Sequence, residues 1–165
     1  MIFNRKRHST ILYNTLLHLS RNLYFYNKIN LKDTFETRIY LMFIHFSIIL
    51  TIYKSKKIKF PQHDYDDLFY SIENDLRELG YGDVAVNKKM KELNKIFYDI
   101  LLKIIKSENK LNFNKDLVIK YFENLKETNN EKYQLFEQYF VEFYHFCFDM
   151  HPKIMIKEAI KFEIK

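Results

Sequence analysis

The stretch Asp75-Leu76-Arg77-Glu78-Leu79-Gly80-Tyr81-Gly82-Asp83 holds both glycines of this 165-residue chain. Glycine reaches positive φ angles without a Cβ clash, so such a chain is expected to place its glycines where the backbone turns sharply. Gly80 stands where a helix would end, and Asp83 stands where the next helix would be capped. The stretch therefore predicts a helix, a tight structural turn at Gly80 and Gly82, and a second helix.

Apolar residues at spacings of three and four define a helix on each side of this turn. The preceding segment has this spacing at Leu68, Phe69, Ile72, Leu76 and Leu79. The following segment has it at Val86, Met90, Leu93, Phe97, Ile100, Leu101 and Ile104. Each helix would therefore bury one apolar stripe. The acidic residues Asp64, Asp66 and Asp67 indicate the start of the first helix, because negative charge suits a helix N-terminus.

Helical patterns also cover most of the remaining chain, and no strand pattern competes over a comparable length. The further ranges are 10–19, 33–53, 114–126, 130–150 and 152–162. Asp33 is the expected N-cap of the helix in 33–53, with Glu36 completing a capping box. The sequence therefore predicts an all-α fold, a compact bundle of about six to seven helices in one domain over residues 1–165.

The uncharged segment Ile39–Tyr53 is the one stretch that suggests a membrane span. Its 15 residues fall short of the roughly 20 that cross a bilayer, and His45 lies at its centre. We expect a buried core helix, in which His45 is a hydrogen-bonded core residue rather than a metal ligand.

The chain is basic, with a net charge of +6 and a pI of about 9.2. The basic residues gather in three clusters. These are Arg5-Lys6-Arg7, then Lys54, Lys56, Lys57 and Lys59, then Lys88, Lys89, Lys91 and Lys95. Such clusters attract nucleic acid, anionic lipid or acidic protein without choosing among them, and they also occur as a plain solvated surface.

Candidate catalytic and metal-binding groups do not converge in the sequence. Gly80-Tyr81-Gly82 follows a helix and lacks the Lys-Ser of a phosphate loop. The six histidines are scattered, and Asp75 and Glu78 have no nucleophile nearby. We therefore expect no enzyme and no bound metal or cofactor.

The expected compartment is a reducing one. Cys147 is the single cysteine, so no intrachain disulfide can form. The basic segment 1–8, expected to be flexible, lacks the apolar run of a signal peptide. It also lacks an Arg/Ser-rich transit segment, which favours a bacterial cytoplasm over a mitochondrial matrix.

The turn and its flanks resemble the ubiquinol–cytochrome c chaperone family. The resemblance covers residues 23–102, with 110–165 as a helical C-terminal part. The signature is Leu-Arg-Glu-hydrophobic-Gly-x-Gly-Asp, found here in Asp75–Val86, followed by Lys88-Lys89-Met90-Lys91 and Phe97-Tyr98. Upstream, the matching residues are Phe25-Tyr26, Asp33-Thr34, Arg38, His45 and Asp67-Leu68-Phe69. Thr37 and Leu31-Lys32 depart from the family pattern, which has Gly and Val-Pro there.

This resemblance implies an all-helical assembly factor of the cytochrome bc1 complex in the respiratory chain. Its client would be newly made cytochrome b, an apolar membrane protein. It would act peripherally at the bacterial inner membrane or near the ribosome, with a small partner protein. The alternative is a basic helical module that binds RNA or DNA.

The candidate site residues follow from the signature and from the need of a chaperone to hold an apolar helix. A groove lined by aromatic residues would take client segments, with core packing as the alternative role of its lining. The partner-binding candidates are Phe25, Tyr26, Asp33, Arg38, Arg77, Tyr81, Asp83 and Phe97. The basic candidates Lys88, Lys89, Lys91 and Lys95 would bind ribosomal RNA or an anionic membrane surface.

Overall fold

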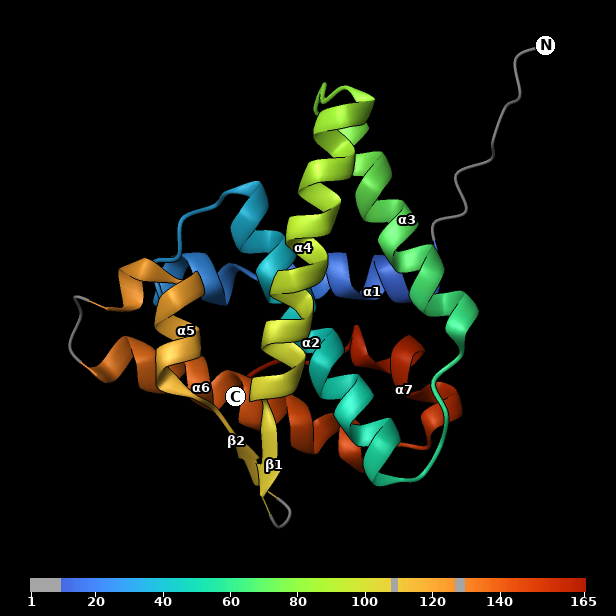
Figure 1. The fold of residues 1–165 in the computed structure, drawn as a ribbon. Coiled ribbons are helices and arrows are strands. Elements are labelled where there is room, and N and C mark those ends of the chain that lie inside the picture. The colour runs from blue at the N-terminus through green and yellow to red at the C-terminus, as the bar shows by residue number, and fades with distance from the viewer. Residues whose placement is uncertain (1–9, 108–109, 127–129) are drawn as a thin grey trace.

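The computed structural model describes residues 10–107, 110–126 and 130–165, so the predicted flexible segment 1–8 lies outside the described residues. Helices dominate the described chain and confirm the all-α prediction (Figure 1). The helices are α1 (Ile11–Ser20), α2 (Phe35–Ser55), α3 (Gln62–Glu78), α4 (Asp83–Lys103), α5 (Lys115–Tyr121), α6 (Asn130–Phe148) and α7 (Pro152–Ala159). Two short turns of other helix types occur, a π-helical turn at Tyr24–Lys28 and a 3₁₀ turn at Glu123–Leu125.

Helix α2 is the centre of the core and contacts α1, α4 and α6. Every residue from Leu41 to Ile49 is buried, because apolar side chains face all sides of the helix. By length and composition α2 is, within the described residues, the one helix that could cross a membrane. Since 61% of its most apolar window is buried inside the protein, it has the character of the predicted core helix.

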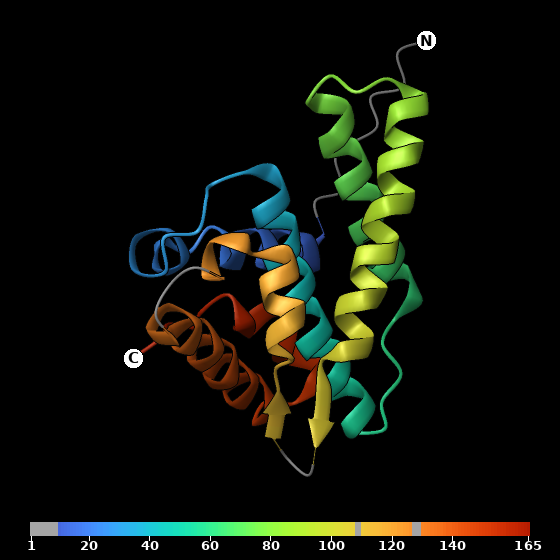
Figure 2. The ribbon, with the colours of Figure 1, turned by 60° about the vertical axis from the view of Figure 1, so that its left-hand side comes forward.

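Helices α3 and α4 form a hairpin that packs on one side of α2. The ring of Phe97 in α4 lies 5.2 Å from Phe43 and 5.5 Å from Phe46, both in α2, and 5.4 Å from Phe69 in α3. These contacts bury most of the predicted stripes of both helices, whereas Leu79 at the end of α3 stays exposed and Met90 and Leu101 are half-buried. The end of the hairpin, where α3 turns into α4, projects beyond the rest of the fold (Figures 1 and 2).

Helix α6 supplies the aromatic residues of another part of the core. His45 of α2 lies among its rings, 4.9 Å from Phe140 and 4.8 Å from Phe143. The imidazole Nδ1 donates to the Leu41 carbonyl at 2.7 Å, and Nε2 accepts from the Tyr139 hydroxyl at 3.0 Å. The prediction of a hydrogen-bonded core histidine is therefore confirmed.

The structure corrects three local predictions. Thr34, not Asp33, caps α2, because its hydroxyl accepts from the Thr37 N–H. Gly82, not Asp83, is the N-cap of α4, and Asp83 is the first helical residue. The expected helix over 114–126 ends at Tyr121, since Phe122 leaves the helical conformation at ψ 73°.

A small antiparallel hairpin, absent from the sequence predictions, connects α4 to α5. Its strands are β1 (Ile105–Ser107) and β2 (Lys110–Asn112), and Ile105 pairs with Asn112. Strands of three residues are too short to leave an alternating pattern in the sequence.

Candidate functional site

The turn between α3 and α4 is the centre of the candidate site, and we call residues 79–84 the hairpin tip. Gly80 has φ +97°, which confirms that it ends α3 in the left-handed region. The Tyr81 N–H donates to the Leu76 carbonyl at 3.3 Å, and the Gly80 N–H donates to the Arg77 carbonyl at 3.0 Å. These two bonds form a Schellman motif, so backbone hydrogen bonds hold the tip in place.

Several predicted site residues come together around the hairpin tip. The Arg77 guanidinium lies 3.6 Å from the Asp83 carboxylate across the turn and 3.4 Å from Glu73 within α3. The Lys89 ammonium lies over the Tyr81 ring, 5.0 Å from its centroid. These contacts lie at or near the protein surface, so they orient the side chains more than they stabilise the fold.

The hairpin tip exposes apolar side chains that sequence spacing had assigned to the core or left unplaced. The exposed fractions are 58% for Leu79, 38% for Tyr81 and 85% for Val84. Leu79 continues the apolar spacing of α3, but it is the C-cap of that helix and no described element covers it. The tip is therefore an apolar surface fixed on a rigid turn, which suits recognition of another apolar surface.

A second group of predicted residues lies at the start of α2. Arg38 donates to Asp33 through Nε at 2.7 Å and through Nη2 at 2.9 Å, a bidentate ion pair. This pairing lowers the pKa of Asp33. Tyr26 is half-buried beside them and donates to the Ser20 carbonyl at 2.7 Å. Within the described chain, no hydrogen bond or ion pair connects these three residues with the hairpin tip.

Phe25 and Phe97, predicted to line a partner groove, are both fully buried. Phe25 stacks with Phe140 at 5.7 Å, and Phe97 stacks with Phe46 at 5.5 Å. Their spacing placed them on apolar stripes, and those stripes face the core. The structure thus shows the packing role that had been kept as the alternative, and a groove would require the core to open.

The basic candidates lie on α4, on the side facing away from the core. Lys88, Lys91 and Lys95 are exposed, and within the described residues none of them forms an ion pair. Lys89 is half-buried against Tyr81. Three of the four lysines therefore remain available for an anionic partner.

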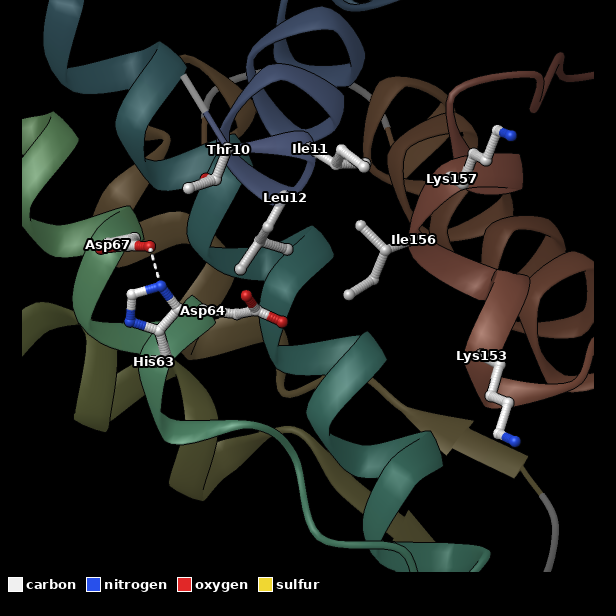
Figure 3. A pocket seen from close by; sticks show the side chains of 9 residues that line it. All are labelled: Thr10, Ile11, Leu12, His63, Asp64, Asp67, Lys153, Ile156 and Lys157. Carbon is white, nitrogen blue, oxygen red and sulfur yellow. Dashed lines mark ion pairs between the residues drawn. The ribbon is translucent and has the colours of Figure 1, made fainter. Parts of the chain in front are cut away.

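A cavity of about 660 Å³ opens between α1, α3 and α7 (Figure 3). Figure 3 shows His63, Asp64 and Asp67 on one wall and Lys153 and Lys157 on the other. The His63 Nε2 lies 3.0 Å from the Asp67 carboxylate. This cavity was not foreseen, because its walls come from segments far apart in the chain. Among the described residues that line it there is no cysteine or serine, and the hydroxyl of Thr10 accepts a hydrogen bond from the Tyr13 N–H as the cap of α1.

Other groups that could carry chemistry have structural roles. Burial raises the pKa of the Cys147 thiol to about 12, so this cysteine is an unreactive core residue. Asp75, considered for acid–base chemistry, accepts from the Tyr13 hydroxyl at 2.6 Å and joins α3 to α1. Within the described residues, no group of three or more His, Cys, Asp or Glu side chains is placed to hold a metal ion.

Together the fold and the hairpin tip define a class of structure, an all-α protein with apolar side chains exposed at a helix turn. The ubiquinol–cytochrome C chaperone family model matches residues 27–117, more than half of the chain, and the chain belongs to this family. Comparison with curated proteins and with solved structures gave no match. The matched region includes the whole of α2 and of the α3–α4 hairpin with its tip, and extends to the start of α5.

Family membership supports a chaperone role and suggests a non-enzymatic one with a client protein as partner. The partner-binding roles of the individual residues stay predictions.

Proposed function

We propose that this chain is an assembly chaperone of the respiratory cytochrome bc1 complex that binds newly made cytochrome b. The observation that carries the proposal is the family match over residues 27–117. The client is an apolar membrane protein, so its chaperone needs an apolar surface that does not collapse into its own core. The hairpin tip, with Leu79, Tyr81 and Val84 exposed, offers such a surface.

The tip can bind a client without unfolding the chaperone. The Schellman hydrogen bonds come from the backbone, so the side chains of Leu79 and Tyr81 have no part in closing the turn. Arg77 and Asp83 flank these apolar residues and add polar contacts at the rim. An apolar centre with a polar rim is the usual anatomy of a protein-binding surface.

The site of action in the proposal is the bacterial cytoplasm, peripheral to the inner membrane, with the mitochondrial matrix as the alternative. The exposed lysines of α4 would keep the chaperone close to an anionic surface, either the ribosome or the membrane. A small partner protein would complete the working unit. Attraction of this kind weakens steeply with salt, whereas apolar contacts of the tip with a client do not.

The test is capture of cytochrome b by the tagged chaperone from detergent-solubilised membranes. We expect Tyr81→Ala to reduce the captured cytochrome b without unfolding the chaperone, because the side chain lies at the exposed tip and backbone hydrogen bonds close the turn. Tyr70→Ala is the matched control, since Tyr70 is 43% exposed on α3, compared with 38% for Tyr81. Equal capture by the wild type and Tyr81→Ala would contradict the role of the tip.

A nuclease-treated arm of the same experiment tests the alternative function. The chaperone proposal predicts that cytochrome b stays bound after nuclease treatment. Recovery of nucleic acid alone, abolished by nuclease, would instead show a basic RNA- or DNA-binding module.

A further inference from the structure

The outer face of α4 carries a line of exposed residues that begins at the hairpin tip and that core packing does not explain. The residues are Val84, Lys88, Lys91, Lys95, Tyr98 and Leu102, separated alternately by four and three positions. This spacing places them along one side of the helix, over a length of about 27 Å. We call this line the outer stripe.

The outer stripe is open to solvent over its whole length. Val84 is 85% exposed, Tyr98 is 52% exposed and Leu102 is 74% exposed, and the three lysines between them are exposed as well. The opposite face of α4 holds Phe97 and the other core residues, so the stripe points away from the fold. Figure 2 shows α4 along one side of the molecule, where no described element covers its outer face.

The charge of the outer stripe is positive. Glu92 is an exposed carboxylate beside it and, in the part of the chain that the structure describes, forms no ion pair with these lysines. Two more acidic residues of α4 are already paired: Asp83 lies 3.6 Å from Arg77, and Asp99 lies 2.7 Å from Lys103 and 3.0 Å from Lys120. Lys88, Lys91 and Lys95 therefore outnumber the acidic groups that are free to offset them.

The combination of lysine and aliphatic residues discriminates between anionic partners. Nucleic acid would bind the lysines through its phosphates and stack its bases on aromatic rings. These contacts leave the exposed aliphatic side chains of Val84 and Leu102 without a role. The interface of an anionic bilayer binds both lysine and aliphatic side chains. Ammonium groups bind lipid phosphates, while aliphatic side chains and the tyrosine ring enter the boundary between headgroups and acyl chains.

We propose that the outer stripe binds an anionic lipid bilayer, with α4 lying along the membrane surface. This placement holds the hairpin tip at the same surface, because Val84 belongs to both. An apolar membrane client would meet Leu79 and Tyr81 there. The inference deepens the proposed function by assigning the anionic surface to lipid, but its test uses no client and can fail while client capture stands.

The electrostatic part is tested by co-sedimentation of the full chain with phosphatidylcholine vesicles containing about one-third phosphatidylglycerol. Each lysine near such a surface strengthens binding about fivefold at low salt. We expect the variant Lys88→Gln/Lys91→Gln/Lys95→Gln to bind more than about 100-fold more weakly. The matched control is Lys28→Gln/Lys153→Gln/Lys157→Gln, which removes three exposed lysines from other elements and should bind within a few-fold of the wild type. Equal weakening of both variants would overturn the proposal.

The apolar part is tested with a fluorescent reporter, since the chain contains no tryptophan. We expect the emission of Leu102→Trp to shift to shorter wavelength when anionic vesicles are added. Ile154→Trp is the control, because Ile154 is 50% exposed on α7, a helix that packs on α1 and α6. No shift for Leu102→Trp, or an equal shift for both variants, would contradict insertion of the outer stripe.

Binding to RNA is the competing outcome. The wild type would then fail to bind the vesicles but bind a single-stranded RNA oligonucleotide, and the variant Lys88→Gln/Lys91→Gln/Lys95→Gln would lose the RNA binding. These results would show that the outer stripe binds nucleic acid and that the lipid proposal is wrong.

Discussion

The buried histidine of α2 makes the stability of this protein depend on pH in a defined window. Burial lowers the pKa of His45 from 6.5 to about 3, and the hydrogen bond to the Leu41 carbonyl offsets only part of this effect. The imidazole is neutral in the folded state, where its Nε2 accepts from the Tyr139 hydroxyl. In the unfolded chain the same group titrates near 6.5.

The direction in which stability changes with pH follows from proton binding. Above pH 6.5 both states hold a neutral imidazole, and His45 contributes no pH dependence. As the pH falls below 6.5 the unfolded chain takes up a proton that the folded protein does not accept until about pH 3, so the free energy of unfolding decreases across this window. One unit of difference in pKa corresponds to about 1.4 kcal/mol. At pH 4.5, two units below the unfolded pKa, the loss is therefore about 2.7 kcal/mol.

The assay is urea unfolding, followed by circular dichroism at pH 7 and at pH 4.5. His45→Gln removes the titrating group but keeps an amide that can form hydrogen bonds. We expect the wild type to lose about 2.7 kcal/mol more stability between the two pH values than His45→Gln does. His145→Gln, which removes an exposed imidazole, should behave as the wild type. If His45→Gln and the wild type lose the same amount, the neutral buried state of His45 is refuted.

Three further predictions concern single residues and are measured by the same unfolding assay. Gly80→Ala should destabilise the protein by about 1–2 kcal/mol, because alanine is strained at φ +97° even though there is space for its Cβ. The control Gly82→Ser, at φ −73°, should change stability by less than about 0.5 kcal/mol. Equal effects of the two substitutions would contradict the reasoning. Lys57→Gly should stabilise the protein by about 0.5–1 kcal/mol, since Lys57 has φ +57°, and destabilisation would show that its side chain holds the turn after α2. Asp99→Asn should cost about 1–2 kcal/mol at pH 7, because the carboxylate joins Lys103 of α4 to Lys120 and the Tyr121 hydroxyl of α5. These partners lower the pKa of Asp99, so the cost should shrink as the pH falls below about 3.9, and a cost that is the same at pH 7 and pH 3 would argue against an ionic link.

The α3–α4 hairpin shows how much of the fold could be read from the sequence. The apolar stripes of both helices have helical spacing over many residues, and Gly80 is needed where φ must be positive, so local chemistry alone places the turn. The burial of Ile39–Tyr53 was foreseen on similar grounds, because the segment is apolar but too short to cross a membrane.

The candidate site was foreseen less completely. The sequence could place Phe25 and Phe97 among apolar residues. It could not tell whether they line a groove or lie in the core, because a groove lining and a core face give the same aromatic pattern in sequence. Conversely, the exposure of Leu79 and Leu102 depends on where neighbouring helices stop, which no local pattern records. A signal for the outer stripe did exist: the lysines of α4 continue at the same spacing to Val84, Tyr98 and Leu102.

Long-range polar contacts could not be predicted for a different reason. His45 and Tyr139 are 94 positions apart, and Asp99 and Tyr121 are 22 apart. Each residue alone has several possible partners, and only the packing of α2 against α6 and of α4 near α5 selects one. The short β1–β2 hairpin likewise depends on the ends of α4 and α5 being close.

The central claim is that this chain assists the assembly of the cytochrome bc1 complex. Its most direct test is deletion of the gene, followed by measurement of assembled bc1 complex and of total cytochrome b in the membranes. Our account predicts that both decrease and that the wild-type gene restores them. Normal amounts of both in the deletion strain would contradict it.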